Sequence, residues 1–178
     1  LDACRLSTLE AGIAYSLVLM TTKYLRLTFN SPTQSQRLDQ VRIKLSAIEA
    51  AVRGKRLVLV DDSIVRGTTS GRIVGLLREA GAREIHLRIS APPFMNPCYY
   101  GTDIDSREHL IACKHTAEET ARIIGADSLG YLPVEVLPEL AGTDGICTAC
   151  FDGRYPTPIP ADTRKDRFER RLSEVISR

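Results

Sequence analysis

The sequence predicts an α/β fold, in which a mostly parallel sheet is flanked by helices. The first sign is a β-branched run, Arg56–Val60, which a Gly-containing loop follows. Apolar residues at helical spacing and a second apolar strand, Glu84–Ser90, come next, so that about 35 residues make one βαβ unit with a right-handed crossover. The second sign is an ordinary composition for a globular domain, with 178 residues, 43% hydrophobic and 26% charged.

Three elements are expected before this unit. Residues 2–11 have a helical pattern that Gly12 would end, and Ile13–Met20 is apolar enough for a buried strand. Residues 42–53 predict a short amphipathic helix, because apolar side chains recur at helical spacing: Ile43, Leu45, Ile48 and Val52.

After the unit, Thr116–Ile124 predicts another helix, and Val134–Leu140 fits either a strand or a short helix. The stretch Gly142–Pro160 is rich in Gly, Pro and Cys, which predicts a loop. The charged tail, residues 162–178, predicts a terminal helix with an apolar stripe: Phe168, Leu172, Val175 and Ile176. No repeat is visible, so one domain is expected.

Charge and hydropathy exclude several classes of function. The net charge of +2 provides no electrostatic footprint for nucleic acid or an anionic membrane. The longest apolar stretch is too short to span a bilayer, and no signal-peptide pattern opens the chain, which favours a cytoplasmic protein. Because the chain begins with Leu1 and enters a helical pattern at once, we expect a fragment whose N-terminal part is missing.

The loop after the first parallel strand has the composition of a phosphate site. It stands at the carboxyl end of a strand, where open α/β sheets bind ligands. Gly67 lets the backbone approach an anion, and Thr68, Thr69 and Ser70 open a helix with free N–H groups. The loop has neither the Walker pattern nor the dinucleotide fingerprint.

Two adjacent carboxylates, Asp61 and Asp62, come just before this loop. They can accept hydrogen bonds from vicinal hydroxyls or help to hold hydrated Mg²⁺. A phosphate on one side and a diol on the other describe a ribose 5-phosphate. The alternative is that the acids and the hydroxyl residues only cap the turn and the helix.

The segment Val60–Ser70 resembles the phosphoribosyl pyrophosphate (PRPP) motif of type I phosphoribosyltransferases. Its residues are most similar to those of one family, the glutamine PRPP amidotransferases (amidophosphoribosyltransferases). Further blocks resemble this family in the same order: Pro32–Gln34, Arg37, Val41–Leu45, Ala91–Pro93, Asn96–Asp103, Ile124–Leu129 and Cys147–Pro156.

The resemblance implies a type I phosphoribosyltransferase-like sheet and a division of the chain. Residues 1–140 would be part of the PRPP-binding domain, and residues 141–178 a Cys-x-x-Cys loop with a terminal helix packed on it. The family's N-terminal glutaminase domain would be absent, so the chain would be the C-terminal part of the enzyme, weak or inactive alone. The full-length form is expected to be a homo-oligomer.

The family's reaction joins ammonia, released from glutamine, to C1 of PRPP, giving 5-phosphoribosylamine and pyrophosphate in the first committed step of purine synthesis. By resemblance, Asp61 and Asp62 would bind the ribose hydroxyls and Mg²⁺. The other PRPP-binding residues would be Ser63, Arg66, Gly67, Thr68, Thr69 and Ser70. Cations should stabilise the departing pyrophosphate, and the candidates for this catalytic role are Arg37, Arg42 and Lys44, together with Tyr24 in a flexible loop over PRPP.

That flexible loop, Thr21–Phe29, departs from the family's pattern. Tyr24 is kept, but Arg26 stands where the family has glycine and Leu27 where it has arginine. The change stiffens a loop that must close and removes a cation, so we expect slow turnover.

Cys98, Cys147 and Cys150 are candidate metal ligands. A Cys-x-x-Cys pair alone is compatible with zinc, iron–sulfur or redox chemistry, or with plain burial. Members of the family with a [4Fe–4S] cluster carry these motifs, and the fourth ligand of such members would precede Leu1. Cys4 and Cys113 fit no ligand position and are expected to pack, and the three histidines receive no role.

Three other functions remain open from the sequence. A PRPP-binding regulator without turnover would share the loop, and so would a salvage phosphoribosyltransferase acting on a nucleobase. The third is an inert, truncated remnant.

Overall fold

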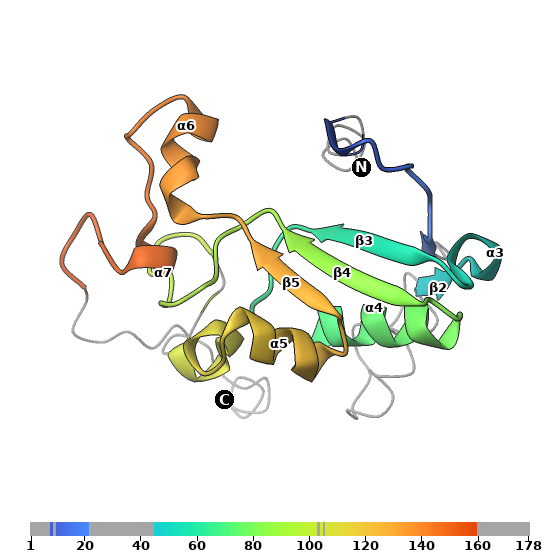
Figure 1. Ribbon diagram of the computed structural model, residues 1–178. Coiled ribbons are helices and arrows are strands. Elements are labelled where there is room, and N and C mark those ends of the chain that lie inside the picture. The colour runs from blue at the N-terminus through green and yellow to red at the C-terminus, as the bar shows by residue number, and fades with distance from the viewer. Residues whose placement is uncertain (1–7, 9, 22–44, 103, 105, 160–178) are drawn as a thin grey trace, which may run out of the picture.

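The computed structural model describes residues 8, 10–21, 45–102, 104 and 106–159 (Figure 1). Its centre is a parallel three-stranded sheet in the order β3 (Arg56–Asp61), β4 (Glu84–Ile89) and β5 (Ser128–Tyr131). Two helices, α4 (Thr68–Glu79) and α5 (Ala117–Ile124), lie together on one face of the sheet (Figure 1). The predicted α/β fold and its βαβ unit are confirmed.

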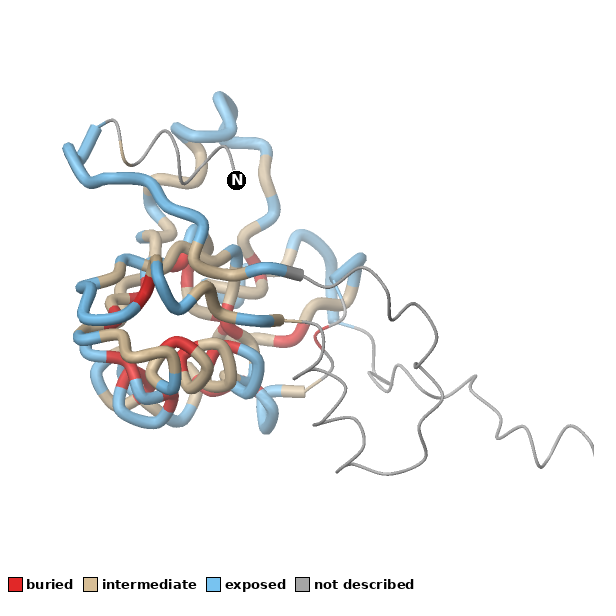
Figure 2. Tube along the Cα trace, turned by 90° about the vertical axis from the view of Figure 1, so that its right-hand side faces the viewer, coloured by how far each residue is buried: buried red, intermediate tan, exposed pale blue. Residues whose placement is uncertain are grey.

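The main core lies between this sheet and the two helices. Alternate residues of β4, Ile85, Leu87 and Ile89, point into it and are buried, as the period-two geometry of a strand requires. Helix α4 buries Val74 and Leu77 against them. The buried residues therefore gather along one side of the strands, as Figure 2 shows.

Helix α5 begins and ends where the sequence predicts. Thr116 and Glu119 form a reciprocal capping box at its start, and Gly125 ends it at φ +80°. The following Asp127 accepts hydrogen bonds from the Ile85 N–H (2.6 Å) and from Arg78 (2.5 Å). This carboxylate thus joins the end of α4, the end of α5 and the start of β4.

The segment before the sheet differs from expectation. Only Leu19–Thr21 is a strand (β1), and it pairs antiparallel with β2 (Leu45–Ala47) rather than joining the parallel sheet. Ile13, Leu17 and Met20 are about half exposed, so the prediction of a buried strand over Ile13–Met20 is wrong. The predicted helix over residues 42–53 is wrong at Leu45–Ala47 and is reduced to α3 (Glu49–Val52), because pairing with β1 prevails over a weak helical preference.

The chain after β4 alternates short helices with loops. Two single-turn 3₁₀ helices, η1 (Arg107–His109) and η2 (Ile111–Cys113), precede α5. After β5 come η3 (Val134–Val136) and α6 (Leu137–Ala141), so the short-helix alternative is the correct one. A four-residue helix, α7 (Ala149–Asp152), stands inside the predicted Gly142–Pro160 loop.

A second hydrophobic cluster lies beyond the carboxyl end of the sheet. Phe94, Ile104 and Leu110 are its buried residues. Residues packed against it come from distant parts of the sequence: Val65, Cys98, Cys113, Cys150 and Phe151. Among the described residues of this cluster, regular structure is limited to Cys113 in η2 and to Cys150 and Phe151 in α7.

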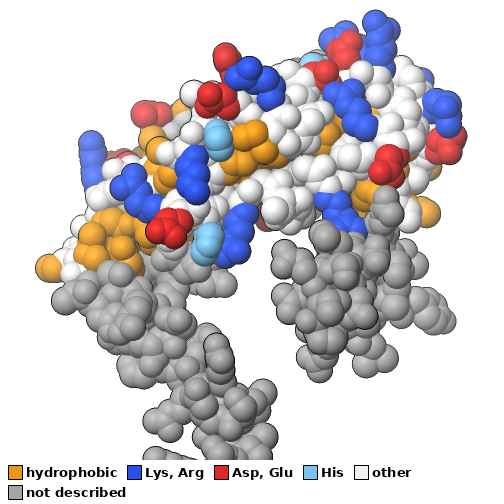
Figure 3. All heavy atoms as spheres, turned by 90° about the horizontal axis from the view of Figure 1, so that it is seen from below, with side chains coloured by type: hydrophobic (Ala, Val, Ile, Leu, Met, Phe, Trp, Pro, Cys, Tyr) orange, Lys and Arg blue, Asp and Glu red, His pale blue; other side chains and the backbone are white. Residues whose placement is uncertain are grey.

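The surface on the side of α4 and α5 carries acidic and basic side chains interspersed, without a large patch of either sign among the described residues (Figure 3). Among those residues, none of the helices has the length and apolar character that crossing a membrane requires. The predicted helix over residues 2–11 lies mostly outside the described residues, and the predicted tail helix wholly so.

Candidate functional site

The anion loop, residues 62–67, connects the end of β3 to the start of α4. Gly67 adopts φ +78°, and a Cβ built there would lie 2.8 Å from Ile111 Cδ1. Both the backbone angle and the space exclude an L side chain without strain. The glycine singled out in the sequence is therefore required by this geometry.

The first turn of α4 is left open to an anion. Gly67 is its N-cap and supplies no side-chain cap, and no acidic residue stands in the first turn. The free N–H groups and the positive end of the helix dipole therefore remain for a ligand. Thr68 and Thr69 are exposed, whereas Ser70 is 3% exposed, so the hydroxyl of Ser70 lies in the interior.

Asp61 ends β3 on the same side of the sheet as α4, because side chains alternate along the strand and Leu57 and Leu59 pack against the main core. Its Oδ1 accepts a hydrogen bond from the Asp62 N–H at 3.0 Å. Asp62 is exposed, and its Oδ1 accepts from the Ser63 hydroxyl at 3.3 Å. The Asp61 side chain thus lies on the side of the sheet that carries α4, whereas the Asp62 carboxylate reaches solvent.

Burial raises the pKa of Asp61, and the neighbouring charge of Asp62 raises it further, although the Asp62 N–H opposes the shift. Two adjacent carboxylates that repel each other gain when a cation or a hydroxyl donor binds between them. The strand end that carries them is fixed by Ser90, the residue after β4, whose backbone N–H and hydroxyl both donate to the Asp61 carbonyl (3.0 and 3.1 Å). No local pattern predicts this role of Ser90.

The candidate catalytic residues Tyr24, Arg42 and Lys44, with Arg37, lie outside the described residues, and so does Cys4. Arg66 is exposed within the anion loop.

Cys98 and Cys150 pack against the second cluster, and Cys147 is exposed three residues before Cys150. Burial raises the pKa of the Cys98 thiol, but backbone N–H groups of Gly101, Tyr100 and Thr102 outweigh it and hold the pKa at about 7. The Thr102 N–H lies 3.4 Å from Cys98 Sγ. These donors favour the thiolate form, which is the form that binds metals.

Cys150 behaves in the opposite way. Burial, and then the negative charges of Cys98 and Cys147, raise its pKa to about 11. The charges of Cys98 and Cys147 thus act on the Cys150 thiol. Over the described part of the chain, however, no group of three or more His, Cys, Asp or Glu side chains is arranged to hold a metal ion.

Two loops meet near Cys98 and Cys150. The Met95 and Asn96 N–H groups donate to the Cys150 carbonyl (2.9 and 3.0 Å), and the Tyr155 hydroxyl donates to the Pro97 carbonyl (2.7 Å). Cys113 donates to the Met95 carbonyl at 3.1 Å and packs against the second cluster, which confirms that it is a packing residue.

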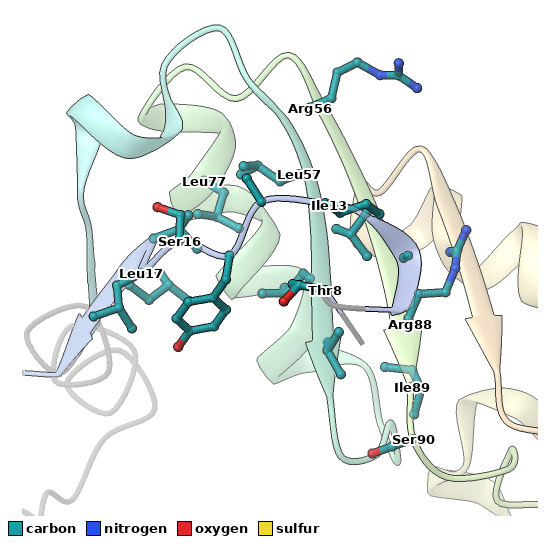
Figure 4. A pocket seen from close by; sticks show the side chains of 18 of the residues that line it. Thr8, Ile13, Ser16, Leu17, Arg56, Leu57, Leu77, Arg88, Ile89 and Ser90 are labelled. Atoms are coloured by element: carbon teal, nitrogen blue, oxygen red, sulfur yellow. The ribbon is translucent and has the colours of Figure 1, made fainter. Parts of the chain in front are cut away.

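A cavity of about 700 Å³ lies on the other face of the sheet. Residues of the 13–19 segment and of β3 and β4 line it, with Arg88 and Ser90 at its edge (Figure 4). Neither Asp61 nor the anion loop lines it. Its walls are mostly apolar, and Val58 on this face is 46% exposed, so it is separate from the site that the sequence predicts.

The histidine of β4 takes part in a polar ladder across the sheet. His86 Nδ1 lies 2.9 Å from the Ser128 hydroxyl and Nε2 lies 3.3 Å from Glu84. The contact with Ser128 joins β4 to β5, whereas Glu84 lies on β4 itself, so His86 has a structural place outside the anion loop.

Comparison with known proteins identifies relatives over most of the chain. No protein-family model matches it. The amidophosphoribosyltransferase of Bacillus subtilis is 52% identical over 158 residues, which cover 85% of this chain and 33% of that protein. The amidophosphoribosyltransferase of Methanothermobacter thermautotrophicus is 49% identical over 154 residues, covering 85% of this chain and 32% of the relative.

A solved structure agrees with these relatives. The glutamine PRPP amidotransferase from B. subtilis complexed with ADP and GMP superposes with a TM-score of 0.77 at 50% sequence identity, over 88% of this chain and 36% of that one. The chain spans about a third of the length of the curated relatives that it matches. In sequence and in fold, it is therefore a homologue of the phosphoribosyltransferase part of amidophosphoribosyltransferases.

Proposed function

We propose that the chain provides the PRPP site of an amidophosphoribosyltransferase, the enzyme that replaces the pyrophosphate at C1 of PRPP by ammonia at the start of purine synthesis. The observation that carries this proposal is the pairing of an uncapped α4 N-terminus with two carboxylates at the end of β3. Relatives of that name at about 50% identity support it.

The 5-phosphate would lie at the start of α4. The N–H groups of the first turn and the hydroxyls of Thr68 and Thr69 would donate to its oxygens, and Arg66 would add a positive charge. Ser70 would contribute its N–H, because its hydroxyl is buried. Ser63 would assist by holding the Asp62 carboxylate in place.

Asp61 and Asp62 would accept hydrogen bonds from the ribose hydroxyls. Their oxygen donors also suit Mg²⁺, which, when bound, offsets the charge that develops on pyrophosphate as the C1–O bond breaks. Arg42 and Lys44 would stabilise the same charge, and Tyr24 would belong to the loop that excludes water. The reaction depends on positioning and charge, and this chain's residues need move no proton.

Cys98, Cys147 and Cys150 would hold a [4Fe–4S] cluster, with a fourth ligand from elsewhere. Two observations support this assignment: the charges of Cys98 and Cys147 raise the pKa of Cys150, and the Cys98 sulfur accepts a hydrogen bond from the Thr102 N–H. When bound, the cluster would link α7 to the loop around Cys98, where regular structure is sparse. We also propose a cytoplasmic, homo-oligomeric enzyme with PRPP and ammonia or glutamine as substrates, divided at residues 140/141.

The reaction itself tests the proposal. The chain is mixed with PRPP, Mg²⁺ and ammonium chloride at alkaline pH, and pyrophosphate release is measured against the Asp61→Asn and Asp62→Asn double variant. We expect slow, ammonia-dependent release that the double variant lacks. Binding without release would favour a PRPP-binding regulator, a function that the departures from the family's pattern at Arg26 and Leu27 keep open. Release with a nucleobase but not with ammonia would contradict the proposal.

A further inference from the structure

The anion loop is anchored in two different hydrophobic clusters by consecutive residues. Ile64 is buried in the main core, together with Val74 and Ile89. Val65, the next residue, packs against the second cluster around Phe94. The loop therefore crosses the boundary between the two clusters within one peptide unit.

A second segment crosses the same boundary in the same way. Leu110 is buried in the second cluster, and Ile111 is buried in the main core. The Ile111 N–H donates to the Val65 carbonyl at 2.9 Å. The two crossing segments are thus joined by a backbone hydrogen bond where the clusters meet.

The side chain of Ile111 lies directly under Gly67. A Cβ at Gly67 would be 2.8 Å from Ile111 Cδ1, and the other described atom within 4 Å is Ile124 Cγ2, at 3.5 Å. Ile111 therefore supports the anion loop by its backbone at Val65 and by its side chain at the residue that caps α4.

We propose that Ile111 is a positioning residue for the anion loop. It sets the conformation of residues 62–67 and, through Gly67, the direction of the first N–H groups of α4. The consequence for PRPP binding rests on the proposed function, whereas the effect on the loop does not. Packed apolar residues transmit such constraints because protein interiors are dense and deform little.

The first test compares Ile111→Ala with Ile85→Ala, a matched control. Ile85 is also buried in the main core but lies near the amino end of β4, away from the anion loop. Amide signals of residues 62–69 are followed by NMR, and PRPP binding with Mg²⁺ by calorimetry. We expect Ile111→Ala to shift or broaden these signals and to weaken binding about tenfold, and Ile85→Ala to lower stability without either effect. Equal effects of both variants would overturn the proposal.

The second test remains informative if Ile111→Ala fails to fold. Ile111→Val removes Cδ1, the atom that a Cβ at residue 67 would meet. Alone, it should weaken PRPP binding slightly. Combined with Gly67→Ala, it should instead improve binding and loop signals relative to Gly67→Ala alone. The absence of this reversal in the loop signals would contradict the proposal, whereas wild-type chain that fails to bind PRPP would contradict only the proposed function.

Discussion

The two hydrophobic clusters of this chain are built by different means. The main core is made by periodic elements, in which β4 buries every second residue and α4 buries Val74 and Leu77. The second cluster gathers Phe94, Ile104 and Leu110 from loops and holds them by hydrogen bonds between distant residues, such as that from Tyr155 to Pro97. The candidate ribose-phosphate site lies at the boundary between them, so one side of the site is set by local pattern and the other by long-range contacts.

The largest expected difference concerns two thiols of the second cluster. With a pKa of about 7 for Cys98 and about 11 for Cys150, the thiolate of Cys98 is far more abundant at neutral pH. Alkylation of metal-free chain by iodoacetamide, followed by mass spectrometry, should modify Cys98 about a hundredfold faster than Cys150.

The lowered pKa of Cys98 also sets how the two alkylation rates depend on pH. The rate at Cys98 should increase with pH with a midpoint near pH 7, whereas the rate at Cys150 should still be increasing at pH 10. Cys98→Ser provides the control for peptide assignment. Equal rates for the two residues would show that the N–H groups around Cys98 do not stabilise its thiolate.

The next largest effect is expected from a substitution that removes a buried side chain from the main core. Leu77 is fully buried between α4 and the sheet. Leu77→Ala should lower the free energy of unfolding by about 3 kcal/mol, through lost burial and the cavity left behind. Urea denaturation followed by circular dichroism measures this, with Leu140→Ala on exposed α6 as the control. A loss below about 1 kcal/mol would mean that the core is less closely packed than the fold implies.

A smaller effect is expected where α4, α5 and β4 are joined. The Ile85 N–H, and then Arg78, lower the pKa of Asp127. A lowered pKa adds stability above the carboxyl's unfolded value, and this stability is lost as the pH falls through the folded value. Asp127→Asn should therefore cost no more than about 1 kcal/mol at pH 7, because the pair is partly exposed, and less as the pH falls below the carboxyl's unfolded pKa. A constant difference from pH 7 to pH 2 would contradict the assignment.

The smallest effect is predicted for a buried hydroxyl at the end of β5. Tyr131 OH has no hydrogen-bond partner among the described residues. Removing an unsatisfied buried group relieves its desolvation cost, so Tyr131→Phe should leave the melting temperature unchanged or raise it slightly. A clear decrease in calorimetry would mean that this hydroxyl has a partner in solution.

The sequence predicts the main core better than the second cluster for a physical reason. Residues 56–90 form strand, helix and strand from local spacing, and Thr116 and Gly125 cap α5 by local chemistry. The pairing of Leu19–Thr21 with Leu45–Ala47 depends on two segments that meet only after folding. Local periodicity in residues 42–53 therefore predicted a helix where a strand forms.

The same limit applies to the candidate site. Asp61, Asp62 and Gly67 stand where their spacing places them, at a strand end and a helix start. Ser90 holds the Asp61 carbonyl from 29 residues away along the chain, and Ile111 lies at least 44 residues from the anion loop. Neither carries a local signature, because a serine after a strand and an isoleucine at the start of a 3₁₀ helix are ordinary. Only the tertiary structure shows that they support the loop.

The central claim is tested most directly by titrating the purified chain with PRPP in a calorimeter, with and without Mg²⁺, beside the Asp61→Asn and Asp62→Asn double variant. The account predicts binding that depends on Mg²⁺ and that the double variant loses while keeping the wild-type circular dichroism spectrum. Binding of equal strength by a folded double variant, or no binding by folded wild-type chain, would contradict it.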